Sequence, residues 1–245
     1  MAVRKKAVAK KKAAPKASKA VAKRQSTSIA DMRAQMAQEV ASIQDRIGAP
    51  ATNNISIKNG EFTFPDGSIV RDSIDVVIVD FICRNMYYDK PWKEGVVTPP
   101  ACWAINKVPA ALTPSNNVVK RQAPKGKSCA DCSMNQFGSD GDGKACKNQR
   151  VLAVLLPDAA PDDPIMTIVF PPTAMKPFDG YVSSVSRLFQ VPPVGVITQI
   201  GFHPEKTYPL PLCGNPRPNE RVEDFFMRRP EAEIALTAEP DPNAA

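Results

Sequence analysis

Four cysteines near the middle of the chain carry the clearest chemical signal in the sequence. Cys129 and Cys132 are three positions apart, so a tight turn can direct both thiols at one ion, and Cys146 follows fourteen residues after Cys132. Cys102 lies 27 residues before Cys129 and supplies the distant piece of chain that usually completes a tetrahedral site. The spacing predicts that these four thiolates bind one zinc ion.

A closed set of four thiolates leaves no position for water, so the predicted zinc site would stabilise the fold and would not catalyse a reaction. Cys213 and His203 are the substitute ligands if Cys102 is not one. The alternative interpretation, an ordinary buried thiol, suits Cys83 in its apolar run. The amino-terminal residues show no secretory pattern, and in a reducing compartment clustered cysteines bind metal more often than they pair.

Signals of catalysis are weak in this sequence. His203 is the only histidine and precedes a proline, and no spacing of acidic residues places two carboxylates on one metal ion. We therefore expect that the protein is not an enzyme. No run reaches the roughly 18 apolar residues of a membrane-spanning helix, so we expect no membrane partner.

The net charge of +7 is unevenly distributed along the chain. Residues 1–25 hold ten lysines and arginines and no acid, residues 107–150 hold eight bases and three acids, and residues 151–245 hold seven bases and twelve acids. The first segment is thus a cationic arm, which favours sequence-independent, salt-sensitive contact with nucleic acid. A solubility or localisation tail is the alternative interpretation of the arm.

Aromatic and basic side chains alternate just before Cys102, and further basic side chains surround the other cysteines. Rings with lysines between them suit single-stranded nucleic acid, because unpaired bases stack and phosphates need neutralising. We expect Trp103 and Phe137 to lie in the core. The predicted nucleic-acid contacts are Arg84, Tyr87, Tyr88, Lys90, Trp92, Lys93, Lys107, Lys120, Arg121, Lys125, Lys127, Lys144, Lys147 and Arg150. For the three aromatic residues among them, the alternative is a position in the core.

The ends of the chain are expected to be disordered apart from one helix. Residues 1–25 have almost no bulky side chain and cannot bury a core. Residues 28–48 carry apolar side chains three or four positions apart, which predicts an amphipathic helix that packs on its own domain or on a partner. Residues 206–245 form a proline-rich and acidic tail, of which the last fifteen residues, with four acids and no bases, are expected to be flexible.

The residues from 54 to 205 are expected to form the core that positions the cysteines. Short apolar runs predict strands at 55–57, 62–64, 74–83, 151–156, 165–170 and 194–202, with a helix within 174–189. The run at 74–83 is nearly continuous, which predicts burial on both faces. The pattern favours a mainly β (α+β) fold, a small barrel-like domain with an inserted cysteine zinc subdomain at 100–150.

Several motifs in this region are shared with a known group of proteins. They are FPDG at 64–67, NMYY at 85–88, PPACWAI at 99–105, CADCSMNQFGS at 129–139, GKACKNQR at 143–150 and PPTAMKPF at 171–178, followed by Tyr181. Through them the chain resembles zinc-cysteine proteins of tailed bacteriophages, whose layout is similar to phage helix-destabilising single-stranded-DNA-binding proteins. The resemblance implies an oligonucleotide-binding (OB) barrel with a zinc subdomain and an acidic tail.

The resemblance and the charge pattern predict a zinc-stabilised, sequence-independent single-stranded-DNA-binding protein of phage DNA replication or recombination, located in the cytoplasm of the infected bacterial host. The acidic tail would bind replication or recombination proteins, and the chain could self-associate. The alternative is a zinc-containing phage transcription or host-takeover factor that binds DNA nonspecifically and docks on a protein partner. A metal-dependent nuclease and a virion protein with a DNA-packing arm are further alternatives.

Overall fold

The computed structural model describes residues 53–91 and 98–240, together with Met32, Gln35, Met36, Gln38, Glu39, Ser42 and Ile43. The chain divides into two units, Met1–Ala51 and Thr52–Ala245. The seven described residues of the first unit are helical and lie within the helix predicted at 28–48. The basic arm predicted at 1–25 lies outside the described residues.

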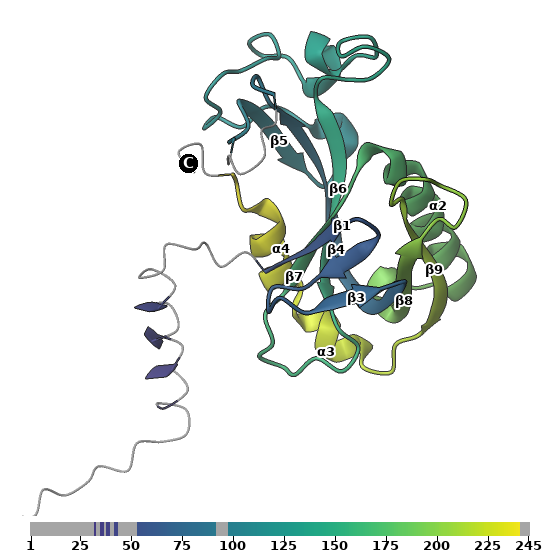
Figure 1. The fold of residues 1–245 in the computed structure, drawn as a ribbon. Coiled ribbons are helices and arrows are strands. Elements are labelled where there is room, and N and C mark those ends of the chain that lie inside the picture. Colours follow the sequence, from purple (N-terminus) through teal and green to yellow (C-terminus); the bar gives the residue numbers. More distant parts are fainter. Residues whose placement is uncertain are drawn as a thin grey trace, which may run out of the picture. The chain divides into compact units, whose positions relative to one another are not determined.

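The second unit is built on a sheet of nine strands, drawn in Figure 1. Their spatial order is β3-β2-β1-β7-β6-β4-β8-β9, and β5 pairs with β4 outside this path. The pair of β1 and β7 is parallel, and the other pairs are antiparallel. The strands are β1 (Asn54–Lys58), β2 (Glu61–Thr63), β3 (Ile69–Arg71), β4 (Ser73–Tyr87), β5 (Cys102–Asn106), β6 (Lys147–Leu155), β7 (Met166–Phe170), β8 (Val196–Phe202) and β9 (Pro211–Pro218).

The fifteen-residue strand β4 is the common element of this sheet. Its first residues pair with β8, its residues from Val77 to Met86 pair with β6, and its last residues pair with β5. Its side chains enter two separate apolar cores: Val76 and Ile78 belong to one, whereas Val77 and Val79 belong to the other. This two-sided burial explains the nearly continuous apolar run and confirms the prediction made from it.

A one-residue bulge interrupts the pairing of β4 with β6. Ile78 is opposite Val154, but Asp80 is opposite Ala153, so Val79 is an additional residue on β4. Because side chains of a strand alternate between its faces, one inserted residue reverses the facing of all that follow. Even-numbered side chains such as Ile78 face the first core before the bulge, whereas after it Phe81 packs on that core and Ile82 enters the second.

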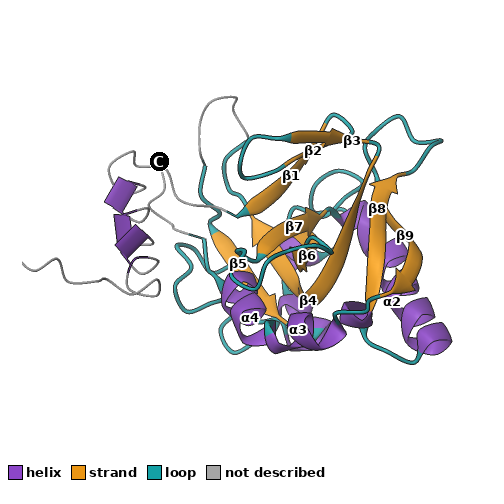
Figure 2. Cartoon of the chain, turned by 90° about the horizontal axis from the view of Figure 1, so that it is seen from below, coloured by secondary structure: helices purple, strands orange, loops and turns teal. Residues whose placement is uncertain are grey.

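Three helices cover the two faces of the sheet (Figure 2). They are α2 (Pro172–Phe189), α3 (Val222–Met227) and α4 (Arg229–Thr237). Ala174 and Phe178 of α2 complete the first core, and Phe225 of α3 with Ala232 and Leu236 of α4 completes the second. Pro172 is the first residue of α2 and Pro230 is the second residue of α4, and both restrict the first turn, where a backbone N–H has no helical partner.

The prediction of a mainly β, α+β fold is confirmed, with most of the unit in one curled sheet. The expected strands and the helix within 174–189 are all present, whereas β3, β5, β9, α3 and α4 were not predicted. The prediction of a flexible tail is wrong for residues 231–237, because they belong to α4, whose Ala232 and Leu236 are buried in the second core. None of the described helices is long and apolar enough to cross a membrane.

The aromatic contacts of α2 give a test of the first core. Phe178 is 1% exposed, and its ring packs edge-on against Phe81 and Phe170 at centroid distances of 5.0 and 5.6 Å. We expect Phe178→Ala to lower the free energy of unfolding by about 3–5 kcal/mol, because it removes buried apolar surface and leaves a cavity. Urea unfolding followed by circular dichroism measures the change.

A control variant lies on the same helix. Leu188 is 71% exposed, so Leu188→Ala should change the free energy of unfolding by no more than about 0.5 kcal/mol. Equal losses in the two variants would contradict the packing of α2 described above.

Candidate functional site

The Cys129–Cys132 turn is fixed by its own sequence. It is a 3-10 turn, η2 (Cys129–Asp131), in which the Ser128 hydroxyl accepts a hydrogen bond from the Ala130 N–H and the Asp131 carboxylate accepts one from the Ser128 N–H. The Cys132 N–H donates to the Cys129 carbonyl at 3.3 Å. This reciprocal capping closes a turn that holds both cysteines on the same short loop.

The four cysteines predicted as ligands line one small cavity of about 10 Å³, together with Trp103 and Asn85. Cys102 begins β5, Cys129 and Cys132 flank η2, and Cys146 directly precedes β6. All four are buried and none forms a disulfide. A cavity of this size holds about one water molecule. The structure therefore brings together thiols that lie up to 44 positions apart in the sequence.

A chain of hydrogen-bonded amide side chains attaches the segment from Cys102 to Cys146, called the cysteine segment below, to the sheet. Asn148 of β6 donates from Nδ2 to Asn85 Oδ1 at 2.6 Å and to Asn135 Oδ1 at 2.9 Å, and Asn135 Nδ2 donates to the Cys129 carbonyl at 2.9 Å. Asn85 and Asn148 are paired across β4 and β6. Asn85 is only 4% exposed, so its polar group requires such partners. This chain was not predicted from the sequence, although a polar residue such as Asn85 just after an apolar run was a signal.

Burial and the neighbouring thiols both raise thiol pKa values in this cavity. Burial, reinforced by Cys102 and Cys132, raises the pKa of Cys129 to about 11, against a hydrogen bond from Asn85 and the charge of Arg121. Burial is also the main cause that raises the pKa of Cys146 to about 12, and the other three thiols add to it. These electrostatic effects require the four side chains to be close to one another.

The remaining candidate ligands lie elsewhere. Cys213 is on β9, opposite Ile200 of β8, and packs against the first core. His203 follows β8, and its Nδ1 accepts a hydrogen bond from the Glu205 N–H. Within residues 53–91 and 98–240, no three His, Cys, Asp or Glu side chains are positioned as the ligands of one metal ion. Neither Cys213 nor His203 lines the cysteine cavity.

An open groove of about 820 Å³ lies beside the cysteine segment. One wall comes from the end of β4 and the residues after it, and the other comes from the loop before Cys146 and the first residue of β6. Tyr88 is 42% exposed. The side chains that line the groove are Tyr87, Tyr88, Asp89, Lys90, Pro91, Thr98, Ser139, Asp140, Ala145 and Lys147. Four of the predicted nucleic-acid contacts therefore share one concave surface.

Three predicted contacts instead hold the fold together. Arg150 is 6% exposed and donates from Nε and Nη2 to the Asp179 carboxylate of α2 at 3.0 and 2.8 Å. Arg121 donates to the carbonyls of Pro114, Ala123 and Lys127 and so organises the loop before η2. Arg84 Nε donates to Gln149 Oε1 across β4 and β6.

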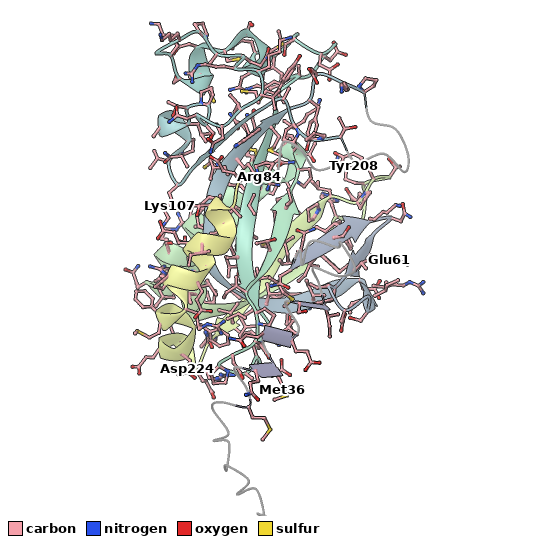
Figure 3. All side chains as sticks on the ribbon, turned by 90° about the vertical axis from the view of Figure 1, so that its left-hand side faces the viewer. Met36, Glu61, Arg84, Lys107, Tyr208 and Asp224 are labelled. Atoms are coloured by element: carbon pink, nitrogen blue, oxygen red, sulfur yellow. The ribbon has the colours of Figure 1, made fainter. Side chains whose placement is uncertain are left out.

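Lys107 also has an internal role. Its ammonium group lies 3.3 Å from the carboxylate of Asp80, at the bulge of β4, and 3.4 Å from the carboxylate of Glu233 on α4. Figure 3 shows Lys107 beside α4. The Asp80 carboxylate in addition accepts a hydrogen bond from the Phe81 N–H at 2.8 Å. Lys107 therefore connects the bulge with a helix of the second core.

The other predicted contacts are more accessible. Lys120, Lys125 and Lys127 are exposed and form no ion pair with a described residue. Lys147 pairs with Asp140 at 3.0 Å. Trp92 and Lys93 lie outside the described residues.

The two rings expected in the core differ. Trp103 is buried, as predicted. The prediction for Phe137 is wrong, because its side chain is 81% exposed. Phe137 stands in a loop of glycine and polar residues, which offered it nothing apolar to pack against.

The carboxyl-terminal residues contact the cysteine segment through Glu239. Its carboxylate accepts hydrogen bonds from the Ser115 hydroxyl at 2.6 Å and from Asn117 Nδ2 at 2.8 Å, and these bonds lower the pKa of Glu239. One acid of the predicted tail is thus bound internally. Residues 241–245 lie outside the described part of the chain.

No protein-family model, curated protein or solved structure matches the chain.

The raised thiol pKa values predict how the metal-free protein responds to alkali. Unfolded chains lose these protons near the ordinary value of 9.0, whereas the folded protein keeps those of Cys129 and Cys146 up to about 11 and about 12. The unfolded state then binds fewer protons, so stability is full below pH 9 and falls as the pH rises toward 12. For each proton that only the folded state retains, the free energy of unfolding falls by about 1.4 kcal/mol per pH unit.

Urea unfolding of the chelator-treated protein between about pH 8 and about pH 11 measures this slope. Cys146→Ala removes one of the retained protons and should show a shallower fall over the same range. The same slope in the variant and the original protein would contradict the burial of the Cys146 thiol.

Proposed function

We propose that the protein binds single-stranded DNA without sequence preference, in the groove between the end of β4 and the cysteine segment. The observation that supports this most directly is the composition of the groove, which Tyr87, Tyr88, Lys90 and Lys147 line together. Rings beside cations can stack unpaired bases and neutralise their phosphates. Duplex DNA, whose bases already stack on one another, offers these rings no free base.

The charged side chains of the groove are compatible with the binding of a polyanion, which would replace a carboxylate of the protein as the partner of a lysine. Lys147 is held by Asp140 at 3.0 Å in an exposed pair, and such pairs contribute about 0–1 kcal/mol. A DNA phosphate would replace Asp140 at little cost. Lys120, Lys125 and Lys127 of the neighbouring loop extend the cationic surface, and the basic arm at 1–25 would add salt-sensitive affinity.

We further propose that Cys102, Cys129, Cys132 and Cys146 bind a zinc ion that stabilises the cysteine segment. The shared cavity and the mutual effects on thiol pKa values support this, and Arg121 adds positive charge that favours thiolates. Cys102, Cys129, Cys132 and Cys146 would hold the ion through their sulfur atoms, and the ion would compensate the charge of the thiolates. The ion would be structural, and the wall of the groove that lies between Cys132 and Cys146 would depend on it.

Because of the resemblance described above, we also propose that the protein has an OB barrel, comes from a phage, acts in the cytoplasm of the bacterial host and recruits replication proteins. The curled sheet is compatible with a barrel-like binding domain. A zinc-containing factor that docks on a transcription partner would bind duplex and single strands alike, so strand preference separates the two functions.

The first test measures strand preference and the contribution of the groove. We expect the full chain to bind an oligothymidylate more tightly than a duplex of equal length, with affinity that falls as salt rises. Tyr88→Leu combined with Lys90→Gln should lower the affinity about 10-fold or more, because base stacking contributes about 1–3 kcal/mol per base. Fluorescence anisotropy at several salt concentrations measures both effects.

The chain offers a matched control for this double variant. Tyr208 and Lys206 have the same two-residue separation, and Tyr208 is similarly exposed at 46% but does not line the groove. Tyr208→Leu with Lys206→Gln should bind as the original protein does. Equal affinity for duplex and single strands would contradict the proposed function, and equal losses in the two double variants would contradict the groove as its site.

The second test concerns zinc. Because burial keeps the thiols of Cys129 and Cys146 protonated at pH 7 without metal, binding of zinc should release about one proton per thiol. Titration of the metal-free protein with zinc in dilute buffer measures the release, and atomic absorption measures retained metal. Cys102→Ser should lose zinc affinity, whereas Cys213→Ser should keep it. Loss in neither variant, or equal loss in both, would contradict the proposed ligands.

A further inference from the structure

Phe137 is the most exposed large apolar side chain of the described residues, at 81%. It stands between Cys132 and Cys146, in the loop that forms one wall of the groove. A phenyl ring in water contributes no packing, because burial is the source of its stabilisation in a fold. Its position therefore has no explanation within the core.

The ring of Phe137 is associated with a cation. The Lys144 ammonium group lies 5.0 Å from the ring centroid, within the range of a cation–π interaction. An exposed ring beside an ammonium group presents the two chemistries that a nucleotide needs, a stacking surface for the base and a positive charge for the phosphate.

The loop that carries the ring is held by its own hydrogen bonds. The Gly138 N–H donates to the Gly143 carbonyl at 2.9 Å, and the Ser139 hydroxyl donates to the Met134 carbonyl at 3.0 Å while it accepts from the Ala145 N–H at 2.9 Å. Binding in such a loop loses less conformational entropy than binding in a loop that must first become ordered.

The loop also joins the ring to the groove. Ser139, Asp140, Ala145 and Lys147 line the groove, and Phe137 is two residues before the first of them. A DNA strand that leaves the groove along this wall would pass the residues next to Phe137 and Lys144 in the sequence.

We propose that Phe137 stacks on an unpaired base of single-stranded DNA that extends out of the groove, and that Lys144 neutralises the adjacent phosphate. This inference rests on the proposed function and adds a contact outside the groove. It assigns a base-stacking role to a ring of the cysteine segment, which the zinc ion would hold from both ends of its loop. The contact requires a base but no particular base, since every base has an aromatic face.

The test compares an oligothymidylate with an abasic strand of the same length and charge, using the full chain. Phe137→Leu should bind the oligothymidylate about 10-fold more weakly and the abasic strand within about twofold of the original protein. Lys144→Gln should weaken binding of both strands. Phe226→Leu is the matched control, because Phe226 on α3 is also exposed, at 45%, with Arg229 4.4 Å from its ring centroid. α3 lies away from the cysteine segment, at the other end of the long strands in Figure 1.

A second readout reports stacking directly. The original protein, whose tryptophans are Trp92 and Trp103, gives the background signal. Phe137→Trp should show more indole fluorescence quenching than the original protein with the oligothymidylate, and no more than the original protein with the abasic strand. Because the ring is exposed, the variants should unfold at the same urea concentration as the original protein.

The outcomes separate the inference from the proposed function. If the original protein shows no preference for the oligothymidylate over duplex, the proposed function fails and the inference with it. If that preference is present but Phe137→Leu binds as the original protein does and Phe137→Trp is quenched no more than the original protein, the inference alone is overturned.

Discussion

The additional residue in strand β4 is the constraint on which the rest of the second unit depends. β4 runs between two apolar cores, so each of its side chains must face one core or the other. The bulge at Val79 reverses that facing part of the way along the strand. Before the bulge Ile78 faces the core covered by α2, and after it Phe81 does. One inserted residue therefore determines what the far half of β4 presents to each side.

The cysteine segment uses this reversal. Cys83 and Asn85 continue the face of Phe81 and meet the segment there, Cys83 by packing with Cys129 and Asn85 through the amide chain to Asn148. Without the extra residue, the same positions would face the opposite side of the sheet. Lys107 connects the Asp80 side chain next to the bulge with α4. The bulge, the second core and the cysteine segment are therefore mechanically linked.

The basic residues have two separate roles that charge alone does not distinguish. Arg150 donates hydrogen bonds to the Asp179 carboxylate, and Arg121 donates to backbone carbonyls. A guanidinium group suits such positions because it can donate to several acceptors at once. Most of the lysines stay on the solvent-facing side, where Lys90 lines the groove and the Lys144 ammonium group lies 5.0 Å from the centroid of the exposed Phe137 ring. The cationic surface is consequently smaller, and more concentrated beside the cysteine segment, than the sequence count suggests.

The sequence by itself determined six of the nine strands, α2 and the four cysteines that share a cavity, because alternating apolar residues and a Cys-x2-Cys spacing act over short distances. It could not determine the order of the strands, or that α3 and α4 would be ordered, because Phe225 and Leu236 gain stability only from residues far away in the chain. Likewise, Arg150 was expected to contact nucleic acid but is buried, and Phe137 was expected in the core but is exposed. Burial of a charge depends on a partner such as Asp179, and exposure of a ring depends on having no apolar neighbour, so only the tertiary structure decides both.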